Sequence, residues 1–247
     1  MSLYGSGNRQ YNFDSPVRTP AVELNKVMRL VYVWMGLGLL ATAAMAWLAA
    51  TNPAIEGLRA SPLGFIGSIV VLFGTMIALQ VGLTQSWLTP GRAAALFLAF
   101  SLAMGFTLSL TFQYFVENDP NALTAAFGTT AILFGGMSVY GFTTRADLTS
   151  WGTYLFIGLI GLILAMVFNI FIGSGALAFL ISIAGVVIFT ALTAYDTQKI
   201  KAMTMRPEMQ AGSDLAIKFS ILGAVILYLD FINLFLFLLS LFGGRRS

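Results

Sequence analysis

The chain alternates long apolar runs with short polar segments. A helix that crosses a membrane needs about 20 consecutive apolar residues, and seven runs meet this length. Turn signals separate them, such as Asn118-Asp119-Pro120 and Gly173-Ser174-Gly175. The pattern therefore predicts seven membrane spans, at approximately 27–50, 62–84, 93–115, 122–143, 152–173, 176–196 and 217–242.

These spans predict an all-α polytopic membrane protein with a single transmembrane domain over residues 27–247. Residues 1–26 include Asn, Ser, Pro, Arg and Asp, and we expect them to form a mobile polar arm. The arm is not expected to be a signal peptide, because the first apolar run is too long and has no cleavage site of small residues close behind it.

Composition agrees with a membrane protein and narrows the chemistry. Charged residues make up 9% of the chain, whereas soluble domains carry about 25%. Cysteine and histidine are both absent, which excludes disulfides, thiolate or imidazole metal sites and Ser-His nucleophilic pairs. The net charge of +3 comes from residues in short loops between spans, so nucleic-acid binding is not expected and the bilayer is the expected environment.

Lysine and arginine near the span ends indicate orientation. With the amino terminus inside, ten of them fall in inner segments and three, Arg59, Arg245 and Arg246, in outer ones. We therefore predict a cytoplasmic amino terminus and, for an odd number of spans, an external carboxyl terminus. A re-entrant last run would instead return the tail, with Arg245 and Arg246, to the inside.

Asp230 lies near the centre of the apolar run from Phe219 to Phe242. At about 1.5 Å per residue, it lies roughly 17 Å into a hydrocarbon layer about 30 Å thick. An ionisable group at that depth costs about 2.5–3.5 kcal/mol or more, and it usually faces the bundle interior or a water-filled cavity. Asp230 is therefore a candidate functional residue.

Asp196, at the inner end of the sixth predicted span, is a candidate partner. Taken alone, it resembles an ordinary interfacial charge beside Lys199 and Lys201. The midpoint between residues 196 and 230 is residue 213, which lies in the helix-breaking and N-capping segment Gly212-Ser213-Asp214. The two acids can be level on antiparallel helices if the sixth helix continues past Asp196 to about Met205, before Pro207.

Two carboxyls that meet in a poorly solvated place cannot both ionise near neutrality, and they share a proton. Loss of that proton leaves two repelling groups, which separation or a hard cation such as calcium would relieve. The pair therefore predicts a pH-sensitive cation gate, with a transient calcium site at Asp196 and Asp230.

Two segments around these acids resemble the signature segments of the Bax-inhibitor family, also called the transmembrane Bax inhibitor motif family. The segments are Tyr195-Asp196-Thr197-Gln198-Lys199-Ile200 and Leu227-Tyr228-Leu229-Asp230-Phe231-Ile232-Asn233-Leu234-Phe235. The resemblance implies six helices around a central seventh and a calcium leak closed by an aspartate pair, which matches Asp196 and Asp230. The neighbours Tyr195, Gln198, Tyr228 and Asn233 match the same motifs, and supporting packing and hydrogen bonding are expected of them.

The chain departs from the compact bacterial members in two places. The loop between the acids is about ten residues longer, and it contains Met203, Met205, Pro207 and Met209. The second predicted helix lacks the basic residues that reach the acids in those members, and the first charge after it is Arg92. Either Arg92 or Lys199 is expected to replace them, or the pair works without a cation.

These features favour a calcium leak channel of a bacterial inner membrane, with no cofactor and with calcium as the permeant ion. No enzymatic activity is expected, because Asp196 and Asp230 lack the nearby glycines usual in intramembrane aspartyl proteases. A retinal receptor would need a lysine deep in the last helix, whereas Lys218 lies at its start. The alternative is a non-transporting regulator that binds a membrane protease or stress-response partner through its cytoplasmic arm.

Overall fold

The computed structural model describes residues 20–84, 87–205 and 213–244. The predicted arm therefore lies mostly outside the described residues, as do Pro207, Met209, Gly212, Arg245 and Arg246. The described part is helical, with short connections and no strand. Its helices are α1 (Pro20–Thr51), α2 (Pro53–Ala60), α3 (Pro62–Thr84), α4 (Pro90–Asn118), α5 (Pro120–Thr143), α6 (Trp151–Ile172), α7 (Gly175–Thr204) and α8 (Asp214–Gly243).

Seven helices of the described residues are long and apolar enough to cross a membrane. Each corresponds to one predicted span, so the all-α polytopic fold is confirmed, and the chain is an integral multi-pass membrane protein. The predicted and observed boundaries differ most in two places. The first predicted span starts at residue 27, whereas α1 begins at Pro20. The sixth predicted span ends at residue 196, whereas α7 continues to Thr204. The last helix, α8, runs without a break from Asp214 to Gly243.

The short helix α2 was not predicted. It connects α1 to α3, and its eight residues carry too few apolar positions to suggest an ordered element. Arg59 near its end is only 7% exposed, and its guanidinium donates a hydrogen bond of 2.7 Å to the side-chain oxygen of Gln113 on α4. A residue that the sequence suggested was a simple loop charge therefore fixes this connection against the bundle.

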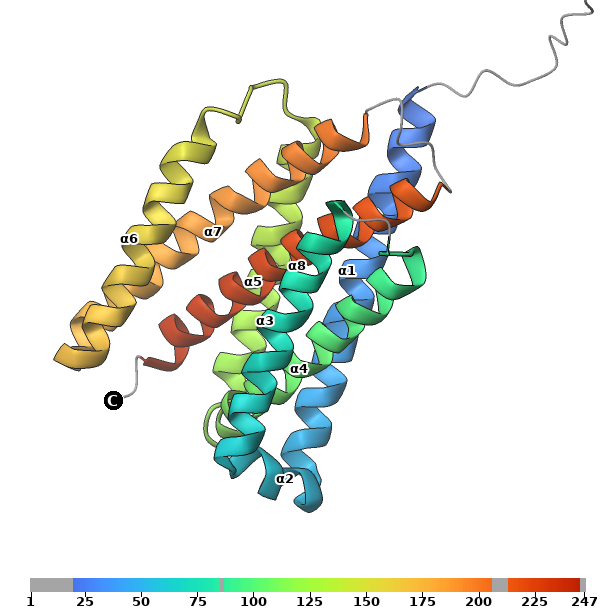
Figure 1. Cartoon of the computed structure of the whole chain (residues 1–247). Helices are drawn as coiled ribbons and strands as arrows, with labels where there is room; N and C mark the ends of the chain where they lie inside the picture. Colours follow the sequence, from blue (N-terminus) through green and yellow to red (C-terminus); the bar gives the residue numbers. More distant parts are fainter. Residues whose placement is uncertain (1–19, 85–86, 206–212, 245–247) are drawn as a thin grey trace, which may run out of the picture.

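The last helix is the most buried of the seven. Within its most apolar stretch 61% of residues are buried, against at most 39% in any other span. It packs against α1, α4, α5 and α7, while α3 packs mainly on α4, and α6 packs on α7. Figure 1 shows α6 and α7 on one side of the bundle and α1, α3 and α4 on the other. A complete ring of six helices around the last one is not confirmed.

Two glycines allow the close helix contacts that position α7 and α1. A methyl group on Gly141 of α5 would overlap the backbone carbonyl of Ala194 on α7, two residues before Asp196. A methyl group on Gly105 of α4 would overlap the carbonyl of Thr42 on α1. Since both neighbours are backbone atoms, a side chain at either glycine would force the helices apart.

The substitution Gly141→Ala should therefore destabilise the protein, by about 1–3 kcal/mol, the usual effect of overpacking. Gly136 is on the same helix with no heavy atom near its added methyl group, so Gly136→Ala should be neutral or stabilising by up to about 1 kcal/mol. Thermal unfolding of the purified protein in detergent would measure both. Equal midpoints for the two variants would contradict the close approach of α5 and α7.

Candidate functional site

Asp196 and Asp230 lie on two consecutive helices, α7 and α8, and the end of α7 and the start of α8 are where the sequence predicted them for two level acids. The helix α7 ends at Thr204, with Met205 as its C-cap, so it continues past Asp196 as the level arrangement requires. The next helix begins at Asp214, and the Ser213 hydroxyl accepts a hydrogen bond of 3.1 Å from the backbone N–H of Ala216. Ser213 thus satisfies one of the N–H groups that a helix start leaves without a partner.

The helices α7 and α8 pack against each other and run in opposite directions (Figure 1). Asp230 on α8 is 5% exposed, and Asp196 on α7 is half-buried. Their carboxyls are close enough to interact electrostatically. One carboxyl oxygen of Asp230, Oδ2, is buried without a hydrogen-bond partner among the described residues. The structure therefore brings both predicted acids to the contact between α7 and α8.

The two candidate cations occupy different surroundings. Lys199 follows Asp196 by about one helical turn and interacts with it electrostatically, and its ammonium lies 5.6 Å from the centre of the Tyr195 ring. Arg92 is exposed, and its guanidinium donates a hydrogen bond of 2.6 Å to the Trp87 carbonyl in the connection before α4. Of these two, Lys199 is the cation placed beside an acid, while Arg92 orders its own connection.

Tyr228 ties α8 to two other helices just before Asp230. Its side chain is fully buried, and its hydroxyl lies 2.6 Å from the Thr42 hydroxyl on α1. Thr42 lies 2.9 Å from the carbonyl oxygen of Ser101 on α4, to which it can donate. The rings of Phe97 and Phe100 meet Tyr228 edge to face, each with centroids 5.8 Å away. Tyr228 therefore packs and hydrogen-bonds where α8 meets α1 and α4.

The other three motif residues make contacts of different kinds. Gln198 bridges α7 to the connection between α5 and α6, because it accepts from the Leu148 N–H at 2.9 Å and donates to the Ala146 carbonyl at 2.8 Å. Tyr195 lies against the start of α6, where its hydroxyl fills the space beside Gly152. Asn233 donates to the Leu229 carbonyl of its own helix at 2.8 Å.

Sequence reasoning missed a second attachment of α7 to α5. The Lys201 ammonium donates a hydrogen bond of 2.6 Å to the Phe142 carbonyl and lies 5.0 Å from the centre of the Phe142 ring. Phe142 is in the last turn of α5, where carbonyls lack partners within the helix and favour a nearby cation. The available signal was a lysine one helical turn before the end of α7, but the sequence does not say which carbonyl it reaches.

A tightly held calcium ion would need more oxygen ligands than the acids provide. Calcium usually takes six to eight oxygens. Within the ranges that the structure describes, no group of three or more acidic, histidine or cysteine side chains could hold a metal ion. The pair offers carboxylate oxygens from two residues, which suits brief contact with a passing cation better than a resident metal.

Comparison with known proteins decides the family. The sequence model described as "Inhibitor of apoptosis-promoting Bax1" matches residues 24–247, a range that includes both acids. The chain belongs to the Bax-inhibitor family. The resemblance inferred from the segments around Asp196 and Asp230 is therefore confirmed at the level of the family, over nearly the whole chain.

Bacterial relatives within the Bax-inhibitor family are similar along almost their full length. The inner membrane protein YbhL of Escherichia coli is 42% identical, over 92% of this chain and 95% of that protein. A protein of Borreliella burgdorferi is 41% identical, over 90% of this chain and 94% of its own. A Caulobacter vibrioides protein is 37% identical, over 91% of this chain and 90% of its own length.

Removal of the Tyr228 hydroxyl should weaken the attachment of α8 to α1. We expect Tyr228→Phe to lower the free energy of unfolding by about 0.5–1.5 kcal/mol, the usual net value of a hydrogen bond. In a double-mutant cycle with Thr42→Val, the coupling energy should be about 1 kcal/mol. Tyr154→Phe serves as the control, because Tyr154 is 76% exposed. A coupling energy near zero would show that the two hydroxyls do not depend on each other.

Proposed function

We propose that this protein is a pH-sensitive leak channel for calcium or similar cations, gated by the Asp196–Asp230 pair. One observation carries the proposal: the carboxyl of Asp230 is nearly fully buried on the most buried helix, and the helix that packs against it carries a second acid, Asp196. Ionisable groups placed so deeply in a membrane bundle are usually on ion or proton pathways. The chemistry expected of the pair follows from this placement.

In the proposed closed state the two carboxyls share one proton. Two negative charges in a poorly solvated space repel each other, so the pair is stable with a proton between the carboxyls. A rise in pH removes this proton, and the repulsion then favours separation of α7 from α8 or the approach of a cation. Cation flux should accordingly be low at acidic pH and higher at alkaline pH.

The neighbouring residues have supporting roles in this proposal. Lys199 beside Asp196 offers a positive charge that can stabilise the ionised form of that acid. Tyr228 and Gln198 hold the two helices to different parts of the bundle, through Thr42 and through the connection after α5. A change at the pair can therefore be transmitted to separate groups of helices. Asn233 and Arg92 have no assigned step, because their hydrogen bonds are local.

We also propose an inner-membrane location with a cytoplasmic amino terminus. The location is supported by the similarity to the Escherichia coli inner membrane protein. The orientation is supported by the distribution of lysine and arginine, with ten on the proposed inner side and three on the outer side. It places the segment between α5 and α6, which Gln198 contacts, on the cytoplasmic side.

Calcium efflux from proteoliposomes at a series of pH values would test the gate. We expect flux through the unaltered protein to rise with pH. Asp196→Asn, Asp230→Asn and the double variant should lose most of that dependence, because an amide cannot exchange the shared proton in this range. Asp147→Asn makes the same chemical change at an exposed acid between α5 and α6, so its pH profile should match that of the unaltered protein.

Two outcomes of this experiment would exclude the proposed gate. Unchanged pH profiles in all Asp196 and Asp230 variants would remove the pair from gating. No protein-dependent flux at any pH would favour the alternative, a non-transporting regulator that binds a membrane protein partner. Deletion of residues 1–20 separates these alternatives further, since a channel should keep its flux without the arm, whereas the regulator should lose its partner.

The orientation can be tested with single cysteines, because the chain contains none. Ala146 between α5 and α6 and Asn121 near the start of α5 are both exposed. In intact cells, a membrane-impermeant maleimide should label Asn121→Cys and leave Ala146→Cys unlabelled until the membrane is permeabilised. The reverse labelling pattern would place the amino terminus outside.

A further inference from the structure

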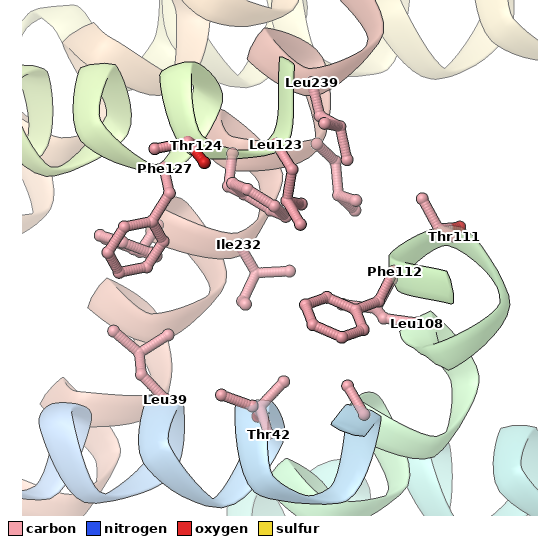
Figure 2. Close-up of a pocket in the computed structure, with 15 residues that line it drawn as sticks. Leu39, Thr42, Leu108, Thr111, Phe112, Leu123, Thr124, Phe127, Ile232 and Leu239 are labelled. Atoms are coloured by element: carbon pink, nitrogen blue, oxygen red, sulfur yellow. The ribbon is translucent and has the colours of Figure 1, made fainter. Parts of the chain in front are cut away.

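An apolar cavity of about 370 Å³ lies between α1, α4, α5 and α8. Figure 2 shows Phe127 of α5 and Phe112 of α4 directed into it, with Ile232 of α8 between them. Small-molecule sites in proteins are usually concave and mostly apolar, with volumes of roughly 300–1,000 Å³. The cavity therefore has the size and lining of a binding site for an apolar group.

One side of this cavity is bordered by residues that face outward from the bundle. Ala43 on α1 and Thr124 on α5 are exposed, and Phe127 is 56% exposed. All three belong to helices that span the membrane, so the surface they share faces lipid. A molecule dissolved in the bilayer can reach the cavity from the side without passing through water.

A second cavity of about 510 Å³ adjoins the first, because Thr111, Leu236 and Leu239 line both. Its other walls include the polar residues Asn118 and Asp119, at the turn between α4 and α5, and also Ser240 near the end of α8. The cavity walls thus change from apolar in the first cavity, inside the membrane, to polar in the second cavity, at the helix ends.

We propose that these adjoining cavities bind one phospholipid from the bilayer. An acyl chain would occupy the apolar cavity, and the ester and headgroup region would lie in the polar cavity. The order of polarity along the cavities matches that of a lipid and its depth in the membrane. Water is a poor occupant of the apolar cavity, because it needs two to four polar partners.

The bound chain would contact α8 immediately after Asp230. Phe231 and Ile232 line the apolar cavity, and so does Thr42, whose hydroxyl contacts Tyr228. The lipid site does not depend on the proposed gate, however, since its walls and mouth are defined without either acid. Its test therefore measures lipid contact directly rather than ion flux.

The experiment uses the full chain in nanodiscs that contain phosphatidylethanolamine with a photoactivatable diazirine in its acyl chain. After irradiation, peptide mapping would compare adducts on cavity residues such as Leu108 and Phe112 with adducts on α6, where Phe168 and Ile170 are 67% and 78% exposed. The α6 adducts report contact with bulk lipid. We expect adducts on the cavity residues, although Phe112 and Leu108 are only partly exposed.

Two pairs of matched variants identify the route of entry. Ala43→Trp should reduce cavity adducts relative to α6 adducts by about tenfold, equivalent to a loss of about 1.4 kcal/mol in binding. Ala44→Trp, at the adjacent exposed alanine outside the cavity, should leave the ratio unchanged. If Ala43→Trp fails to fold, Thr124→Trp with its control Ala125→Trp tests the opposite side of the mouth.

The proposal would be overturned by either of two results. Adducts confined to outward-facing residues, with none on Leu108 or Phe112, would show that no acyl chain enters. An unchanged adduct ratio in folded Ala43→Trp and Thr124→Trp would show that the labelled lipid does not use this mouth.

Discussion

Burial of the Asp230 carboxyl is the constraint on which the rest of this bundle depends. A carboxylate in the interior of a membrane protein loses its hydration, and the bundle must supply a proton, a partner charge or a water-filled space instead. Asp230 is 5% exposed, and the acid that interacts with it, Asp196, cannot compensate a negative charge. In the proposed gate, a proton shared with Asp196 would supply this compensation.

The remaining architecture maintains the contact between α7 and α8. Gly141 lets α5 approach the backbone of α7 just before Asp196, and Tyr228 attaches α8 to α1 just before Asp230. Each acid therefore follows a point at which its helix is fixed by backbone contact or hydrogen bonding. The positions of the two acids therefore depend on the contacts of Gly141 and Tyr228.

Much of this arrangement could be predicted from sequence, because its signals are local. Long apolar runs define the spans, and the Ser213 cap and the continuation of α7 follow from turn chemistry and from the spacing of the two acids. The hydrogen bonds of Lys201 and Arg92 could not be predicted in the same way, since each reaches a backbone carbonyl that only the folded chain brings near. The short helix α2 and the two adjoining cavities likewise depend on how the long helices diverge, which periodicity does not encode.

The attachments of Gln198 and Lys201 have a mechanical consequence. They join the carboxyl-terminal part of α7 to α5 and to the connection after it, whereas Tyr228 joins α8 to α1 and α4. The boundary between the two acids is thus also a boundary between two sets of tethered helices. Across it, the Ser182 hydroxyl of α7 lies 2.9 Å from the Ser240 hydroxyl of α8, and Phe134 of α5 meets Phe231 of α8 edge to face with centroids 5.4 Å apart. Sliding of one set against the other would therefore break fewer hydrogen bonds than bending either helix alone.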